Sequence, residues 1–341
     1  MPRRRVVVVG AGVAGLTAAR KLNGSFDVVV LDKGRGVGGR LATRRIGDAT
    51  FDHGAQFITT HTLEFAETVA AWDRAGVARP WFRGRIGPDG IHDQDGHARF
   101  RGVTTMNAIA KHLADGLDVR VRARVVALAQ SGAAWRVRLD DGTELGADAV
   151  VLSAPVPQAL DLLTAGAVRL AAADAEALRS IRYEACLAVL APLHGPSGLP
   201  DPGAVDPAGG PIDWMADNHL KGVSTVPAIT IHATTDFSEA HWEAPDEIAV
   251  AGLIRAAGLG SEPIDDLIQV HRWRFARPVV IHPDRCLVAD SLPPLVFTGD
   301  AFGGAKVEGA ERSGAAASEA VALLLGGPDP RARIGESGAD R

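Results

Sequence analysis

The first thirty residues place two short apolar runs on either side of a glycine-punctuated segment. Residues 6–9 are all valine, and 27–32 enclose a second apolar run. Runs of this length are typical of strands buried in a parallel sheet. Residues 16–22 between them are mostly good helix formers. The pattern therefore predicts a strand–helix–strand unit of about 30 residues.

The same periodicities predict further elements downstream. Helices are expected at 62–75, 105–114, 158–185, 246–258 and 309–325, and strands at 119–128, 135–139, 149–155 and 295–300. Residues 81–99 predict short strands or a loop, and 186–245 predict strand-like pieces. Asp140-Asp141-Gly142 predicts a hairpin turn.

Composition narrows the class of protein. The 341 residues are 46% hydrophobic and 23% charged, with a net charge of -5. These values are ordinary for a globular enzyme of two domains, and the negative balance disfavours nucleic acid as a partner. The apolar run after Arg3, Arg4 and Arg5 is too short for an export signal, and no run is long enough to span a bilayer. We expect a cytoplasmic protein without nucleic-acid or membrane partners.

The two cysteines, Cys186 and Cys286, lie far apart, and neither has a second cysteine or a histidine at ligand spacing. Two isolated thiols fit a reducing compartment. We expect neither a disulfide framework nor a metal site.

A glycine motif follows the first predicted strand. In the spacing Gly10-x-Gly12-x-x-Gly15, the first glycine permits the turn, the second admits a pyrophosphate close to the backbone, and the third allows close helix–strand packing. The helix N-terminus then offers unpaired N–H groups and a positive dipole to phosphate oxygens. Asp32, about 20 residues further on, is expected to accept hydrogen bonds from ribose hydroxyls. By itself this motif fits either FAD or NAD.

Three further segments favour a flavin dinucleotide. Gly38-Gly39-Arg40 lies where a second loop would approach the pyrophosphate, and Arg40 can pair with it bidentately. Thr298-Gly299-Asp300 ends a late apolar strand, and its aspartate suits a ribityl chain, which NAD lacks. Glu308-Gly309-Ala310 opens the terminal helix, whose N-terminus would stabilise negative charge on a reduced flavin.

These segments resemble the flavin-binding blocks of the amine-oxidase superfamily. The matching blocks are 10–15, 32–40, 54–57, 298–300 and 307–310. Residues 213–216, 231–234 and 271–278 are similar to segments of bacterial renalases, and the resemblance extends with gaps over nearly the whole chain. It implies non-covalently bound FAD and an α/β fold, in which a Rossmann-type FAD-binding domain carries an inserted α+β substrate domain (p-hydroxybenzoate-hydroxylase-like).

The resemblance also implies an activity. A renalase-like oxidase takes hydride from isomeric dihydro-NAD(P), the 2- or 6-dihydro forms, onto flavin, and then passes the electrons to O2. The products are NAD(P)+ and hydrogen peroxide. This sequence departs from bacterial renalases at three positions. Lys306 stands where they tend to have Arg, and Phe57 replaces the usual Tyr. His53 places a larger side chain in the block Asp52-x-Gly54-Ala55-Gln56. These departures concern substrate preference more than flavin binding.

The dinucleotide-type pattern occupies both ends of the chain and one middle piece. We expect a discontinuous FAD-binding domain at 1–60, 100–157 and 292–326, a substrate domain at 61–99 and 158–291, and a flexible tail at 327–341. The predicted cofactor-binding residues are Gly10, Gly12, Ala14, Gly15, Asp32, Lys33, Gly39, Arg40, Gln56, Val125, Gly299, Asp300, Glu308, Gly309 and Ala310.

Hydride transfer from a dihydropyridine needs close stacking on the flavin rather than a nucleophile. His232, in an apolar strand-like context, could contact the nicotinamide amide or be a hydrogen-bonded core residue. Trp273 could line the pocket or pack in the core. Arg272 and Arg277 could receive substrate phosphates or form surface ion pairs. Gln56 is expected to contact the cofactor or the substrate.

Two other functions remain open. One is an amine oxidase or desaturase acting on a small amphipathic molecule, and the other is a flavin redox sensor without turnover. The single tyrosine, Tyr183, lies outside the flavin blocks, so the tyrosine cage of monoamine oxidases is not expected. Cys286 precedes the Thr-Gly-Asp strand, so we expect no covalent bond to the flavin.

Overall fold

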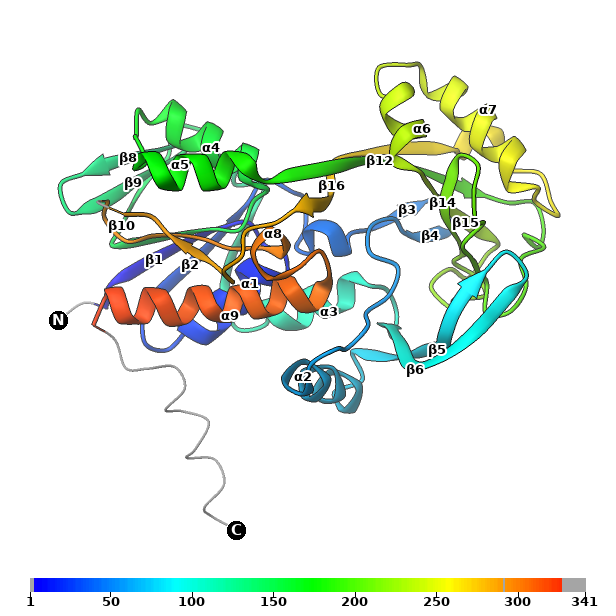
Figure 1. Ribbon diagram of the computed structural model, residues 1–341, viewed down its shortest axis with the longest axis horizontal. Helices are drawn as coiled ribbons and strands as arrows, with labels where there is room; N and C mark the ends of the chain where they lie inside the picture. Colours follow the sequence, from blue (N-terminus) through cyan, green and yellow to red (C-terminus); the bar gives the residue numbers. More distant parts are fainter. Residues whose placement is uncertain (1–2, 291, 327–341) are drawn as a thin grey trace, which may run out of the picture. The chain divides into compact units, whose positions relative to one another are not determined.

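The computed structural model describes residues 3–290 and 292–326 (Figure 1). The tail expected at 327–341 lies outside the described residues. The chain divides into two compact units, each assembled from separate segments. The first unit takes the described residues up to Gly39 together with 110–182 and 278–326, and the second takes 40–109 and 183–277.

The first unit is built on a six-stranded sheet with the order β17-β18-β11-β1-β2-β7. Its strands are β1 (Arg5–Val9), β2 (Asp27–Asp32), β7 (Asp118–Val121), β11 (Ala149–Leu152), β17 (Leu287–Val288) and β18 (Leu295–Phe297). All neighbours pair in parallel except β17, which runs antiparallel at the edge. Val6, Val7 and Val8 of β1 are completely buried. A strand covered on both faces of its sheet needs apolar side chains on both faces, which explains the run of valines. The predicted α/β class with a Rossmann-type sheet is confirmed.

Two helices from opposite ends of the chain pack together in this unit, α1 (Val13–Leu22) and α9 (Val307–Leu324) (Figure 1). The short helix α8 (Asp300–Gly303) packs against α9. A smaller antiparallel sheet contains β8 (Val125–Ser131), β9 (Ala134–Leu139) and β10 (Glu144–Ala147), and the predicted turn at 140–142 joins its last two strands. Helix α4 (Val156–Ala165) packs against β8, and α5 (Ala172–Ser180) follows.

Two predicted elements of the first unit are divided in the structure. The strand expected at 119–128 is interrupted at Arg122, whose φ of 55° ends the extended conformation between β7 and β8. The helix expected at 158–185 is two helices, and the chain is already extended from Arg182.

The second unit is built on a five-stranded sheet with the order β13-β14-β15-β12-β16. Its strands are β12 (Arg182–Pro192), β13 (Ala204–Val205), β14 (Ile212–Asp217), β15 (Ala228–Ala233) and β16 (Gln269–Val280). Leu187, Ile229 and Ile231 form its core with Leu253 of α7 (Asp246–Ala257). The polar-aromatic stretch at 271–278 is therefore part of an edge strand.

The second unit contains further elements, of which α3 continues into the first unit from Ala110. They are the 3-10 turns η1 (Gly39–Leu41) and η2 (Asp265–Leu267), the hairpins β3 (Thr43–Ile46) with β4 (Ala49–Asp52) and β5 (Ala78–Gly87) with β6 (Gly90–Gly102), and the helices α2 (Leu63–Arg74), α3 (Asn107–Ala114) and α6 (Thr235–Ala240). The chain passes between the units at η1, within α3, at the start of β12 and within β16. The expected loop or short strands at 81–99 are the long hairpin β5–β6.

The unit boundaries differ from the predicted domain boundaries. Segments 40–60 and 100–109 belong to the second unit, because β4 packs against β15 and Phe51 shares a core cluster with Leu190. Segments 158–182 and 278–290 belong to the first unit, where α4 packs on β8 and β17 pairs with β18. Hydrophobic periodicity indicates that such segments are buried, but not which sheet buries them.

Glycine allows the helices of the first unit to approach neighbouring backbone. A Cβ on Gly314 of α9 would clash with the carbonyl of Ala14 in α1, and a Cβ on Gly15 would clash with the carbonyl of Gly10. Both obstacles are backbone atoms, which cannot turn away as a flexible side chain can.

We therefore expect Gly314→Ala to lower the free energy of unfolding by about 1–3 kcal/mol, despite alanine's better helix propensity. Gly146→Ala is the control, since a Cβ there would meet no atom within 4 Å; it should change stability by no more than about 0.5 kcal/mol. Urea unfolding of the two variants measures the difference. Equal stabilities would show that α1 and α9 can separate without cost.

Candidate functional site

The turn after β1 lies where the strand order of the first unit reverses. Gly10 has a φ of 108°, and a Cβ on it would lie 2.5 Å from Ser153 Oγ. The Ser153 hydroxyl lies 3.0 Å from each of the carbonyls of Val9 and Gly10 and shares its single proton between them. It thereby joins the carboxyl ends of β1 and β11, the point at which doubly wound sheets bind their ligands. Sequence reasoning missed Ser153.

The N-terminus of α1 has no side-chain cap. Its N-cap is Gly12, and a Cβ on Gly12 would meet no atom within 4 Å, so packing within the protein does not require glycine there. The second glycine loop approaches this position, since a Cβ on Gly39 would lie 3.4 Å from Gly12 Cα and the Gly38 N–H donates to the Ala11 carbonyl at 2.8 Å. Uncapped N–H groups beside a bare backbone fit a pyrophosphate.

Asp32 is oriented by two backbone amides. The Ala11 N–H donates to Oδ2 at 2.7 Å, and the Gly34 N–H donates to Oδ1 at 2.6 Å. Each carboxylate oxygen keeps a lone pair for a further donor. The fixed carboxylate at the end of β2 fits the predicted contact with ribose hydroxyls.

Two further predicted cofactor-binding residues, Lys33 and Val125, lie near the end of β2. Lys33 Nζ donates to Gln158 Oε1 at 3.0 Å, and burial together with Arg124 lowers the pKa of this amine. Val125 is buried at the start of β8. The Ala123 N–H donates to the Asp32 carbonyl at 2.9 Å, which brings this strand start beside the end of β2.

A buried serine holds the turn after β18. Ser313 Oγ of α9 lies 2.5 Å from the Arg285 carbonyl, 2.9 Å from the Gly299 nitrogen and 2.7 Å from Thr298 Oγ1. Because the serine has one proton and donates it to Arg285, it accepts from both other groups. This leaves Gly299 at a φ of 140° and starts α8 at Asp300. Sequence reasoning missed Ser313, although a serine within an alanine-rich helix was a detectable signal.

The terminal helix begins where it was expected. Lys306 is the N-cap of α9 and makes no side-chain cap, while Glu308 in the first turn is buried. Gly309 is required by the protein itself, because a Cβ on it would clash with the carbonyl of Gly304. Ala310 donates its N–H to the Lys306 carbonyl at 3.0 Å. The uncapped first turn offers positive potential to an electron-rich ring.

The first unit therefore gathers these features along one edge of its sheet, at the carboxyl ends of β1, β2 and β18. An anion site, a fixed carboxylate and a second uncapped helix fit the phosphates, the ribose and the ring of a flavin dinucleotide.

In the second unit, the backbone carbonyl of His53 brings together two predicted catalytic residues. Trp273 Nε1 donates to it at 2.8 Å, and His232 Nε2 lies 3.1 Å from it. The rings of His53 and Trp273 stack with centroids 5.3 Å apart. His271 meets both rings edge-on, at 4.7 Å and 4.2 Å.

The imidazoles of this cluster are uncharged at neutral pH. Burial, with His271 next in importance, lowers the pKa of His53 to about 3. Burial and Arg44 lower the pKa of His271 to about 4. Burial also lowers the pKa of His232. Since His232 Nε2 faces a carbonyl, its neutral ring carries the proton on Nε2. The result is a cluster of uncharged rings, with the Arg44 guanidinium acting on His53 and His271.

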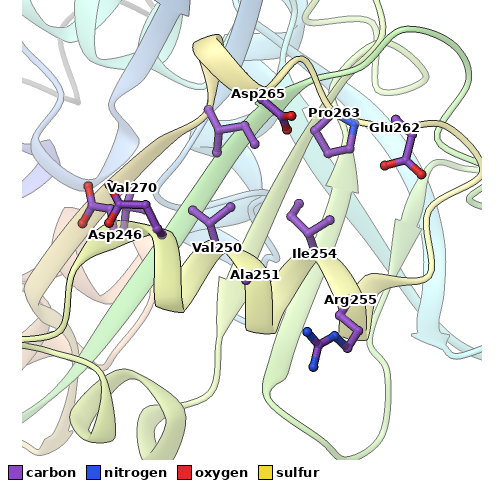
Figure 2. A pocket seen from close by; sticks show the side chains of 11 residues that line it. Asp246, Val250, Ala251, Ile254, Arg255, Glu262, Pro263, Asp265 and Val270 are labelled. Carbon is purple, nitrogen blue, oxygen red and sulfur yellow. The ribbon is translucent and has the colours of Figure 1, made fainter.

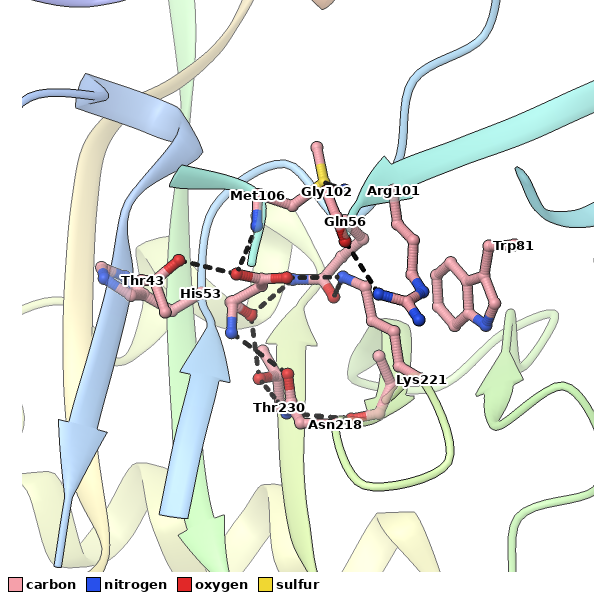
Figure 3. Close-up of polar contacts among 12 residues, drawn as sticks. Thr43, His53, Gln56, Trp81, Arg101, Gly102, Met106, Asn218, Lys221 and Thr230 are labelled. Carbon is pink, nitrogen blue, oxygen red and sulfur yellow. Dashed lines mark hydrogen bonds and ion pairs between the residues drawn. The ribbon is translucent and has the colours of Figure 1, made fainter. Parts of the chain in front are cut away.

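Gln56 is buried and its amide is engaged within its own loop. Nε2 donates to the carbonyls of Asp52 at 2.7 Å and Gly54 at 3.1 Å, and Oε1 accepts from Lys221 Nζ at 3.3 Å (Figure 3). These bonds make Gln56 a residue that shapes the loop after β4. Its predicted contact with cofactor or substrate stays a prediction.

A buried ion pair between Lys221 and Asp52 fixes the point where β4 ends and this loop begins. Lys221 Nζ lies 3.1 Å from Asp52 Oδ2, and both side chains are completely buried. Asp52 Oδ1 accepts from the Thr43 hydroxyl at 2.7 Å and from the Met106 N–H at 3.0 Å, while its carbonyl accepts from the Thr230 hydroxyl at 3.0 Å. Burial lowers the pKa of Lys221, and the contact with Asp52 opposes that shift.

The predicted phosphate-binding arginines all have protein partners in the second unit. Arg40 Nη1 lies 3.3 Å and 3.4 Å from two backbone carbonyls of β16. Arg272 forms an ion pair with Asp246. Arg277 Nη2 lies 2.6 Å from Glu184 Oε2. A substrate phosphate would have to compete with these carboxylates for Arg272 and Arg277, whose proposed roles stay predictions.

A groove beside α7 lies in the same unit but contains none of the predicted site residues. Its volume is about 530 Å³; Val250, Ile254 and Val270 line it, and carboxylates stand at its rim (Figure 2). Within residues 3–290 and 292–326, no three His, Cys, Asp or Glu side chains are grouped to hold a metal ion. No helix in this part of the chain has the length and apolarity needed to cross a membrane.

Comparison with known proteins agrees with this geometry. A family model described as flavin containing amine oxidoreductase matches residues 84–322, and one for an NAD(P)-binding Rossmann-like domain matches residues 8–71. Renalase of Mus musculus is 24% identical over 328 residues, which cover 87% of this chain and 93% of that protein. Probable polyamine oxidase 5 of Arabidopsis thaliana is 40% identical, but over only 60 residues, 16% of this chain and 11% of that protein.

Solved structures show the same fold. A putative protoporphyrinogen oxidase from Exiguobacterium sp. 255-15 is 13% identical with a TM-score of 0.72, and the match covers 95% of this chain and 99% of that one. A double mutant of putrescine oxidase is 16% identical with a TM-score of 0.67, and covers 94% and 99%. Since the amine oxidoreductase model spans more than half of the sequence, the chain belongs to the flavin-containing amine oxidoreductase family, as a renalase-like member.

Proposed function

We propose that this protein is an oxidase with non-covalently bound FAD, and that it converts isomeric dihydro-NAD(P), the 2- or 6-dihydro forms, to NAD(P)+. With flavin bound, the chemistry it supplies would be acceptance of a hydride from the dihydropyridine and its return to O2 as two electrons and a proton, which with one further proton from solvent gives hydrogen peroxide. The observation that carries the proposal is the uncharged aromatic cluster around the His53 carbonyl.

This cluster matches the chemical demands of a dihydropyridine. The dihydropyridine ring of the substrate is flat and neutral, and it becomes aromatic when it loses hydride. Its oxidation therefore depends on orientation more than on acid–base catalysis. Trp273 and His271 offer aromatic faces and edges, which favour a stacked ring. His232 stays neutral and fixed by the His53 carbonyl, so it adds no positive charge that would oppose formation of the pyridinium product.

The first unit supplies the cofactor contacts in this proposal. The N-terminus of α1 would bind the pyrophosphate, Asp32 the ribose, and Asp300 the ribityl chain. The N-terminus of α9 would stabilise negative charge on the reduced ring. Burial raises the pKa of the Cys286 thiol, which keeps it protonated and unreactive and supports a non-covalent cofactor.

Anaerobic mixing with 6-dihydro-NAD should bleach the visible flavin band within a single turnover, and admitting O2 should restore it with release of hydrogen peroxide. Bleaching by amines but not by dihydropyridines would instead establish an amine oxidase. A band that no donor bleaches would favour a redox sensor without turnover.

Asp300→Ala should purify colourless, because it removes the carboxylate proposed for the ribityl chain. Ser313→Ala should weaken FAD binding about tenfold, since it leaves the buried Gly299 N–H without its acceptor. Ser318→Ala is the matched control on the same helix, because that hydroxyl bonds only locally, to the Ala315 carbonyl. Flavin titration of the apoprotein measures all three. Full retention of FAD by Asp300→Ala would refute the ribityl assignment.

The neutral imidazoles also predict a pH dependence of stability. Above pH 6.5, the ordinary histidine pKa, folded and unfolded rings are both neutral. As the pH falls from 6.5 toward about 4, the unfolded chain takes up protons that folded His53 and His271 do not, so the free energy of unfolding decreases. Thermal melts across this range should show a smaller decrease for His271→Gln. Parallel curves for the variant and the wild type would contradict the shift.

A further inference from the structure

The second unit carries a group of cations that the proposed reaction does not use. A cavity of about 620 Å³ opens beside the β5–β6 hairpin. Its lining includes four basic residues, Arg79, Arg83, Arg101 and Lys221, against one acidic residue, Asp201. None of these residues was singled out by the sequence patterns.

Two of the arginines are held directly opposite each other. Arg79 on β5 pairs in register with Arg101 on β6. Like charges at such cross-strand positions are destabilising, because their β-carbons lie close together. The guanidinium groups also converge, since a Cβ on Gly222 would lie 2.9 Å from Arg101 Nη2 and 3.9 Å from Arg79 Nη2. The fold therefore maintains an electrostatically unfavourable arrangement.

Among the described side chains, no carboxylate forms an ion pair with either arginine. Arg101 is only 2% exposed, and its Nη1 donates to the carbonyls of Gly102 and Val103 at 2.8 Å each. The nearby Asp52 is already committed to Lys221 at 3.1 Å. Burial and the neighbouring Arg79 lower the pKa of Arg101 to about 10, so it still carries its charge at neutral pH.

The surroundings keep this geometry rigid. Trp81 Nε1 donates to the Pro202 carbonyl at 3.0 Å, and Lys221 Nζ lies 4.9 Å from the centre of the Trp81 ring. Figure 3 shows Arg101, Lys221 and Trp81, all three of which line the cavity. The Lys221 amine is completely buried and paired with Asp52, so it presents no free donor to the cavity.

We propose that Arg79 and Arg101, with Arg83 at the same cavity, form a binding site for a phosphate group. Guanidinium forks match phosphate oxygens bidentately, and a doubly charged anion would relieve the repulsion between the paired arginines. Trp81 beside them suits the base or ribose of a nucleotide. The site contrasts with Arg272 and Arg277, whose charges are already balanced by Asp246 and Glu184. It does not depend on the proposed redox reaction.

The test uses the flavin-loaded protein, so that the dinucleotide turn of the first unit is already filled. Calorimetric titration with inorganic pyrophosphate should show saturable binding that weakens with salt. Arg79→Gln should raise the Kd at least tenfold. Arg274→Gln removes the same charge from the same unit, at a residue stacked on Trp242, and should leave the Kd within twofold.

Arg79→Glu provides a second and opposite readout. It converts the like-charge pair into an opposite-charge pair, so it should abolish pyrophosphate binding while raising Tm by about 1–3 °C. Titration with ADP distinguishes the sources of phosphate: a Kd at least tenfold lower than that of pyrophosphate indicates a nucleotide, and an equal Kd indicates free phosphate. The proposal fails if the wild type does not bind pyrophosphate saturably, or if Arg79→Gln binds it as tightly as the wild type.

Discussion

Burial lowers the pKa of the Lys221 amine, and Asp52, 3.1 Å away, opposes that shift while the Gln56 amide oxygen accepts from the same amine. Removing one partner of such a pair typically costs about 3–5 kcal/mol, because the other charge is left buried and unanswered. The pair therefore fixes the loop that follows β4. His232 and Trp273 both contact the His53 carbonyl in that loop, so the candidate site depends on the ion pair at Asp52, the residue directly before His53.

In the first unit the controlling constraint is space. Helices α1 and α9 approach at glycine, where one helix passes directly over the other's backbone. The same closeness lets a single hydroxyl, that of Ser313, organise the turn after β18. Ser153, at the end of β11, likewise hydrogen-bonds to the carbonyls of Val9 and Gly10 at the end of β1. Both serines hold backbone groups in place, and these groups in turn define where phosphate and ribityl contacts can form.

Positive charge in the second unit is used in two different ways. Arg272 and Arg277 are balanced by carboxylates and stabilise the edge of the sheet. Among the described side chains, Arg79 and Arg101 face each other without a carboxylate in an ion pair, at a cost to stability that a bound anion would offset. The residue type is the same in both cases, and the difference lies in the partner that the fold provides.

The sequence by itself determined what depends on neighbouring residues: the buried valine strand, the glycine turn after it, the carboxylate ending β2 and the start of the terminal helix near Glu308. These follow from local periodicity and turn chemistry. The tertiary structure decided the break at Arg122, the unit to which segments 40–60 and 158–182 belong, and the partners of Ser313, Gln56 and the arginines. Those outcomes depend on contacts between residues far apart in the chain, which periodicity along one segment does not encode.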